Sequence, residues 1–179
     1  ADADHPDEAL VYANLGFETV TGYTADEAIG RNCRFLQGED TDPGQVATLR
    51  EAIENDVSAT VELRNYRADG TPIWNRVSVS PVYDEGRVTH YVGTQEDVTD
   101  LRNAQRARRR MVEITTDPDR DFEAKVDAML ALGCERLDVD VGFLSAIDDD
   151  FEVLAADSNH PDLQIGEHAP LSQTYCRRT

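Results

Sequence analysis

The chain has 179 residues, 40% of them hydrophobic, and a formal net charge of -19. This length suffices for one full domain and part of a second, and the apolar content is enough for a packed core, which excludes a disordered tail. The negative charge argues against attraction to nucleic acid or to an anionic membrane. Lys125 is the only lysine among the basic residues. An acidic, lysine-poor composition is typical of halophilic proteins from a salt-saturated cytoplasm.

The number and spacing of the cysteines indicate the redox environment of the protein. Cys33, Cys134 and Cys176 are odd in number and have no CxxC spacing, and the sequence shows no signal peptide and no long apolar run. We therefore expect a reduced, cytoplasmic protein with no structural metal and no membrane association.

The first third of the chain predicts one strand and a series of short helices. Residues 9–13 read as a short strand, followed by a helical turn that begins near Asn14 and by a second capped helix between Thr24 and Gly30. A third helix begins at Pro43. Its apolar residues recur at helical spacing: Val46, Leu49 and Ile53.

From Ala59 the apolar period changes to two. Three alternating segments, separated by the turn signals ADGT and DEGR, predict an antiparallel three-stranded meander. Symmetric pairing about Gly70 places Asn65 opposite Asn75 on an otherwise apolar face. The apolar members of that face are Val61, Leu63, Val77 and Val79.

Two amides on an apolar face require hydrogen-bond partners, because an unsatisfied buried amide costs about 1 to 3 kcal/mol. The pyrimidine edge of a flavin is a suitable planar partner, with Val61, Leu63 and Val77 packing on the ring. Gln95 on the third strand reaches the same ring if its register holds. Arg34 and Arg50 are placed to converge on one phosphate. A ring, an amide edge and a phosphate clamp together favour FMN as the cofactor.

A specific motif strengthens this interpretation. The segment NCRFLQ at 32–37, followed by Asn65, Asn75 and Gln95 and by VGTQEDVT, resembles a light, oxygen, voltage (LOV) domain of the PAS superfamily over roughly residues 6–99. The resemblance implies an α+β fold with a PAS-like antiparallel sheet and short helices. It also implies that the family's first strand is missing from this chain.

The resemblance further implies a photochemical role for Cys33, which would otherwise be interpreted as a small buried hydrophobe. Under blue light the sulfur adds to flavin carbon C4a, N5 becomes protonated, and the bond reverts in the dark. Asn32 and Gln37 then contact the ribityl chain and the phosphate region, and Gln95 reorients when N5 changes from acceptor to donor.

The rest of the chain predicts two further segments. Residues 100–120 read as a linker helix or weak coiled coil, with a stripe formed by Leu101, Ala104, Arg108 and Met111. Residues 121–179 begin with an amphipathic helix whose apolar stripe contains Phe122, Val126, Met129, Leu130 and Leu137. A hairpin follows, and this part resembles the truncated opening of a GAF domain of haloarchaeal regulators related to the bacterioopsin activator. The expected domains are therefore 1–99, 100–120 and 121–179.

The opposite face of the meander is expected to carry a partner surface that includes Tyr66 paired with Trp74, together with Arg76, His90 and Val92. Either the linker helix or a second copy of the chain covers it, so a homodimer through this face or through the helix is one expectation. DNA binding is expected only through an output region outside this chain.

These features predict a blue-light photoreceptor module, a sensor and not an enzyme, that passes its signal through the linker helix to a GAF domain and a transcriptional output. Two alternatives remain. One is a flavin redox sensor that works without the adduct. The other is a PAS ligand-binding or protein-interaction module without photochemistry.

Overall fold

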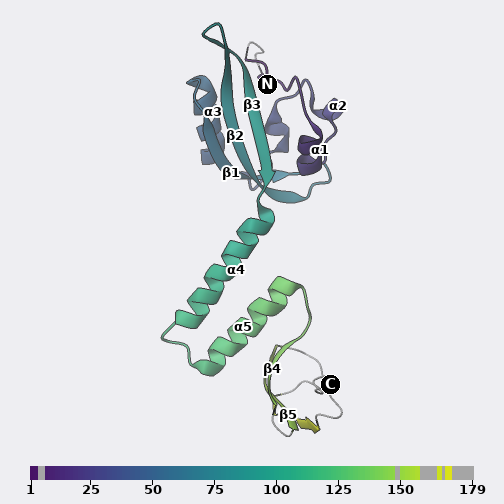
Figure 1. Cartoon of the computed structure of the whole chain (residues 1–179), viewed down its shortest axis with the longest axis vertical. Coiled ribbons are helices and arrows are strands. Elements are labelled where there is room, and N and C mark those ends of the chain that lie inside the picture. The colour runs from purple at the N-terminus through teal and green to yellow at the C-terminus, as the bar shows by residue number, and fades with distance from the viewer. Residues whose placement is uncertain (4–6, 148–149, 158–164, 167, 171–179) are drawn as a thin grey trace. The chain divides into compact units, whose positions relative to one another are not determined.

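The computed structural model describes residues 1–3, 7–147, 150–157, 165–166 and 168–170 (Figure 1). The chain divides into two compact units, residues 1–102 and 103–179. Among the described residues, no helix combines the length and the apolar character needed to cross a membrane.

The first unit combines a sheet with short helices, which confirms the predicted α+β class. Its helices are α1 (Leu15–Thr21), α2 (Ala25–Ala28), the 3-10 helix η1 (Cys33–Leu36) and α3 (Pro43–Glu54). Its strands are β1 (Ala59–Tyr66), β2 (Pro72–Asp84) and β3 (Arg87–Asp97), which form an antiparallel sheet in the order β1-β2-β3. In Figure 1 the short helices lie behind the sheet, on one of its two faces.

Local capping explains where the short helices begin. Thr24 accepts a hydrogen bond from the backbone N–H of Glu27, and the Glu27 carboxylate accepts one from the backbone N–H of Thr24, so α2 starts with a capping box. Asp42 caps α3 by accepting from Gly44 N at 2.8 Å, with Pro43 in the first turn. The structure thus confirms the predicted helices after Thr24 and from Pro43.

The predicted strand over residues 9–13 is wrong. In the described structure this segment has no strand, because Leu10 exchanges its backbone hydrogen bonds with the loop that precedes η1. Leu10 N donates to Arg31 O at 2.9 Å, and Gly30 N donates to Leu10 O at 2.8 Å. Residues 1–3 pair with β3 instead, through a bridge between Asp2 and His90.

The hairpin between β1 and β2 is confirmed, but its predicted register is wrong by two residues. Leu63 lies opposite Asn75, and Asn65 lies opposite Ile73. The loop consists of residues 68–70, with Gly70 in the left-handed conformation at a φ of 83°. A three-residue loop that ends in such a glycine centres the hairpin one position earlier than a loop centred on the glycine itself. A shift of two residues leaves every side chain on its predicted face.

The same shift separates the two aromatic residues that were expected to pair on the outer face. Trp74 lies opposite Arg64, and Tyr66 lies opposite Pro72. The guanidinium of Arg102 stacks on Trp74, at 3.8 Å from the ring centroid. The outer face near Trp74 therefore carries a cation–π contact with the first turn of helix α4 (Thr99–Thr116).

Ion pairs surround this contact. Glu62 on β1 pairs with Arg102 at 2.9 Å and with Arg76 at 2.8 Å, and Arg76 also pairs with Glu96 at 2.9 Å. These contacts connect all three strands of the sheet to the start of α4.

Gly38 allows a close approach between the loop after η1 and the sheet. A Cβ at this position would overlap the ring of Tyr66. The ring is held in place, since its hydroxyl donates to Asp40 Oδ2 at 3.0 Å and accepts from Asp40 N at 3.2 Å. We expect Gly38→Ala to lower the free energy of unfolding by about 1 to 3 kcal/mol, measured by urea denaturation.

Gly133→Ala is a matched control for this prediction, because no atom lies within 4 Å of a Cβ added at that helical position. It should leave the chain as stable as wild type, or more so. A Gly38→Ala protein with wild-type stability would show that Tyr66 can move aside at no cost.

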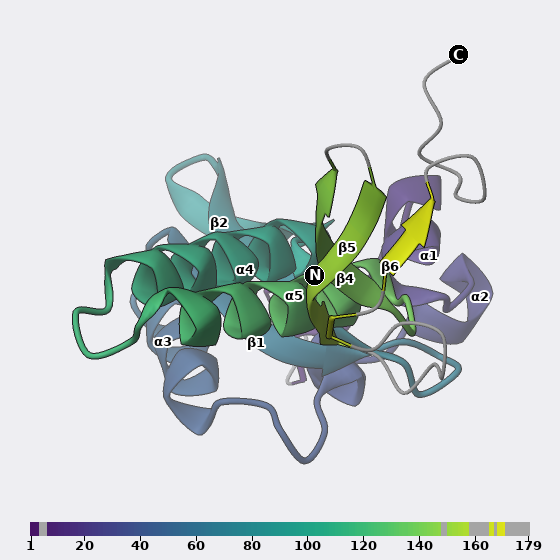
Figure 2. The same ribbon diagram turned by 90° about the horizontal axis from the view of Figure 1, so that it is seen from below.

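The second unit contains the rest of α4 and three further strands. Helix α5 (Phe122–Leu137) packs against β4 (Gly142–Ile147) and β5 (Asp150–Asp157), and β6 (His168–Pro170) completes an antiparallel sheet in the order β4-β5-β6. Figure 2 shows α4 and α5 side by side, and Arg110 of α4 pairs with Glu135 of α5 at 2.6 Å.

The predicted apolar stripe of α5 is only partly correct. Phe122 and Leu137 at its ends are 73% and 72% exposed, whereas Leu132 is buried at 6%. The strands β4 and β5 confirm the predicted hairpin, whose turn at 148–149 lies outside the described residues. Cys176 lies outside them as well. The assignment of residues 121–179 to a GAF domain, and of α4 to a linker, remain predictions.

Candidate cofactor site

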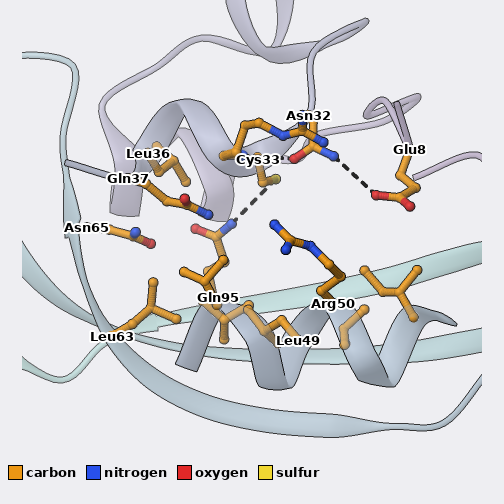
Figure 3. Close-up of a pocket in the computed structure, with 15 residues that line it drawn as sticks. Glu8, Asn32, Cys33, Leu36, Gln37, Leu49, Arg50, Leu63, Asn65 and Gln95 are labelled. Atoms are coloured by element: carbon orange, nitrogen blue, oxygen red, sulfur yellow. Dashed lines mark hydrogen bonds between the residues drawn. The ribbon is translucent and has the colours of Figure 1, made fainter. Parts of the chain in front are cut away.

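A cavity of about 490 Å³ lies in the first unit, between the inner face of the sheet, η1 and α3 (Figure 3). This volume is within the range of about 300 to 1,000 Å³ that is usual for small-molecule sites. Most of the polar lining residues lie at η1 and on the strands, and apolar residues cover the walls. The lining residues are Glu8, Asn32, Cys33, Arg34, Leu36, Gln37, Val46, Leu49, Arg50, Ile53, Leu63, Asn65, Val77, Val79 and Gln95.

The helix η1 places Cys33 on the cavity wall. Asn32 caps it, with its side-chain oxygen accepting from Arg34 N at 3.0 Å. Leu36, at 2% exposure, anchors the other end of the turn in the core. Burial raises the pKa of the Cys33 thiol to about 11. The sulfur therefore carries its proton at neutral pH.

The raised pKa predicts that the ligand-free domain loses stability at alkaline pH. The thiol has an ordinary pKa of 9.0 and a folded-state pKa of about 11, so its contribution is fully present below pH 9 and is lost as the pH rises to 11. Between these limits, we expect wild type to lose about 2 to 3 kcal/mol more unfolding free energy than Cys33→Ala. Urea denaturation of both proteins across this range measures the difference, and parallel losses would contradict it.

Three amides form a connected group beside Cys33. Asn75 is 0% exposed, and its Nδ2 donates to Asn65 Oδ1 at 2.9 Å and to Gln95 Oε1 at 3.0 Å. Gln95 Nε2 in turn lies 4.0 Å from Cys33 Sγ. Asn75 Oδ1 has no partner among the described residues. A buried acceptor without a donor fits a ligand that brings a hydrogen-bond donor to this group.

The two predicted phosphate-binding arginines both line the cavity. Arg34 Nη2 forms an ion pair with Asp7 Oδ1 at 2.8 Å. In the close-up, Arg50 extends from α3 into the cavity (Figure 3). Its guanidinium has no ion pair with any residue that the structure describes.

The structure brings together most of the predicted site residues. Cys33, Asn32, Arg34, Gln37, Arg50, Leu63, Asn65, Val77 and Gln95 line the cavity. Two predicted residues do not line it. Asn75 is 0% exposed and is hydrogen-bonded to Asn65 and Gln95, and Val61 is buried at 4% opposite Val77. The contacts of Asn75 and Val61 with the ring therefore remain predictions.

Sequence reasoning missed several lining residues. Glu8 gave no motif signal. Val46, Leu49 and Ile53 formed a recognised helical stripe, but a stripe alone does not tell whether it faces a cavity or a closed core. The remaining missed residues are Leu36 and Val79.

Comparison with known proteins identifies the family. A family model described as "PAS domain" matches residues 4–100. The chain is 43% identical over 141 residues to Blue-light-activated histidine kinase 1 of Erythrobacter litoralis, a match that covers 76% of this chain and 39% of that protein. It is 50% identical over 106 residues to the Bacterioopsin transcriptional activator of Halobacterium salinarum, covering 59% of this chain and 16% of that protein.

A solved structure gives the same result. The light-state structure of the blue-light photoreceptor Aureochrome1 LOV is 47% identical in sequence, with a TM-score of 0.54, and the match covers 59% of this chain and 87% of that one. The chain thus resembles nearly the whole of this LOV structure, but spans 39% or less of the length of the two curated relatives.

These comparisons contradict the prediction that the protein is not an enzyme. The Erythrobacter relative is a histidine kinase, which is an enzyme. Because the family model covers residues 4–100, more than half of the 179-residue chain, the chain belongs to the PAS domain family, with a LOV-type PAS domain in its first unit.

Proposed function

We propose that this chain is a blue-light photoreceptor module that binds FMN in the cavity beside η1 and uses Cys33 as its photochemical nucleophile. The observation that carries the proposal is the position of Cys33 Sγ, on the cavity wall and 4.0 Å from Gln95 Nε2. When bound, the flavin supplies a ring that absorbs blue light and a carbon, C4a, to which the thiol adds reversibly.

The residues around the cavity match the parts of such a ligand. Asn65 and Asn75 offer an amide edge to the pyrimidine ring, and Gln95 is available to the other polar edge near Cys33. Apolar side chains from α3 and the sheet exclude water from the ring faces. The remaining polar contacts, to the ribityl chain and the phosphate, are assigned to Asn32, Gln37, Arg34 and Arg50.

The protonated state of Cys33 fits a group that must react only after excitation. Burial holds the pKa of this thiol near 11, so the reactive thiolate is scarce in the dark at neutral pH. A thiol bonded to carbon is also a leaving group that can depart again, which a reversible switch requires.

The signal leaves through the strands next to the amide group. Asn75, which binds Gln95, is flanked on β2 by Trp74 and Arg76, both on the outer face. Arg102 of α4 stacks on Trp74. A reorientation of Gln95 therefore acts on a strand that contacts the first turn of α4.

Beyond this turn, we assign α4 as the linker and residues 121–179 as the start of a GAF domain. Similarity to a transcriptional activator supports a transcriptional output outside this chain, which alone would contact DNA. A second copy is a candidate partner for the outer face, where Val92 is 54% exposed, or for α4.

The test is an absorption spectrum of the purified chain, supplied with FMN in high salt, before and after a blue flash. We expect structured flavin bands that bleach after the flash and return in the dark. Bound flavin that does not bleach would favour a redox sensor. A chain that binds no flavin would contradict the assignment of the cavity.

A further inference from the structure

An acidic segment, formed by Asp7 and Glu8, lies at the cavity beside Arg34, one of the two arginines proposed to bind phosphate. Asn32 Nδ2 donates to the backbone oxygen of Asp7 at 2.7 Å and to Glu8 Oε2 at 3.3 Å, the second contact being drawn in Figure 3. Glu8 has a φ of 46°, a left-handed conformation that residues other than glycine seldom adopt. Asn32 thus fastens residues 7 and 8 at the cavity in a defined position.

This segment places negative charge where a phosphate is expected to bind. Asp7 pairs with Arg34 at 2.8 Å, with the two side chains 52% and 62% exposed, and Glu8 lines the cavity itself. Two carboxylates therefore balance the two arginines. Of the two arginines, only Arg50 has no ion pair within the described part of the chain.

We propose that Asp7 is a specificity-determining residue that competes with the ligand's phosphate for Arg34. The inference rests on the proposed flavin-binding function. A phosphate monoester carries about 1.5 to 2 negative charges at pH 7. To bind Arg34 through Nη2 it must displace the Asp7 carboxylate, and it does so beside the charge of Glu8. The phosphate consequently adds less affinity than two unpaired arginines would provide, so Asp7 reduces the preference of the site for FMN over riboflavin.

The test compares the dissociation constants of FMN and riboflavin, measured by flavin fluorescence titration of the flavin-free full chain. In Asp7→Asn, we expect FMN to bind about two- to fivefold more tightly, while riboflavin binding stays unchanged. Asp26→Asn removes the same charge from the exposed first turn of α2 and should alter neither constant. Raising salt from about 0.1 M to about 1 M should reduce the gain, because the Debye length falls from about 10 Å to about 3 Å.

A second variant assigns the effect to Arg34. Adding Arg34→Gln to Asp7→Asn should remove the gain for FMN, since the released cation is then absent. Equal changes for FMN and riboflavin in Asp7→Asn, or no change for either, would overturn the inference while leaving flavin binding intact. If wild type and all variants bind neither flavin, the proposed function fails, and this inference fails with it.

Discussion

Cys33→Ala is expected to abolish the reversible bleaching by blue light while flavin remains bound. Alanine keeps the turn of η1, which is anchored by Asn32 and Leu36, and removes only the sulfur from the cavity wall. The loss should be complete, because no other described cysteine lines the cavity. The measurement is the flash absorption spectrum, followed in the dark until recovery ends.

Cys134→Ala is the matched control for this variant. Cys134 is a partly buried free cysteine of α5 in the second unit, outside the cavity lining. It should bleach and recover as wild type does. Photoreduction of flavin that survives in Cys33→Ala would identify a residual redox response, whereas an unchanged bleaching and recovery cycle would show that Cys33 is not the photochemical residue.

The second large effect is expected from Asn75→Leu, which should weaken FMN binding by about ten- to hundredfold. Asn75 donates to both Asn65 and Gln95, and it holds a buried oxygen without a partner in the described structure. Removing it leaves a ligand's polar edge without part of its hydrogen bonding, at a cost of about 1 to 3 kcal/mol. FMN titration of the flavin-free variant measures the change.

Leucine has the same branched heavy-atom skeleton as asparagine, so we expect Asn75→Leu to fold. It removes an unpaired buried acceptor but leaves Asn65 Oδ1 and Gln95 Oε1 without their donor, so a loss of about 1 to 3 kcal/mol of unfolding free energy is expected. Urea denaturation of the flavin-free protein checks this point. Gln105→Leu removes an amide from an exposed position of α4 and should bind FMN with wild-type affinity. Wild-type affinity in Asn75→Leu would show that the amide group does not contact the ligand.

The hairpin shows how much the sequence could predict about the site. Alternation with a period of two was sufficient to place Asn65 and Asn75 on one face, and this held although the register was wrong by two residues. Gln95 lies opposite Val77 and accepts a hydrogen bond from Asn75, so it lies on the same face of the sheet as the two asparagines, as expected. Alternation along a strand decides which face of the sheet a side chain occupies. The register between two strands depends instead on the type of loop that joins them.

Other features required contacts between segments far apart in the chain. Arg34 was correctly placed at the cavity, but its ion pair with Asp7 joins residues with no shared pattern. In α5 the sequence favoured Phe122 and Leu137 as buried residues, yet Leu132 is the one in the core. A helical stripe is wider than the contact that the neighbouring strands provide, so periodicity cannot select among its members.

The sequence by itself determined the LOV motif around Cys33, the α+β class, the starts of the short helices and the face of each amide. These depend on local capping, on period and on residue type, which act within a few positions of the chain. The tertiary structure decided the burial that keeps the Cys33 thiol protonated and the acidic partner of Arg34. Each of these depends on which distant groups share a low-dielectric or charged neighbourhood, which only the packed chain specifies.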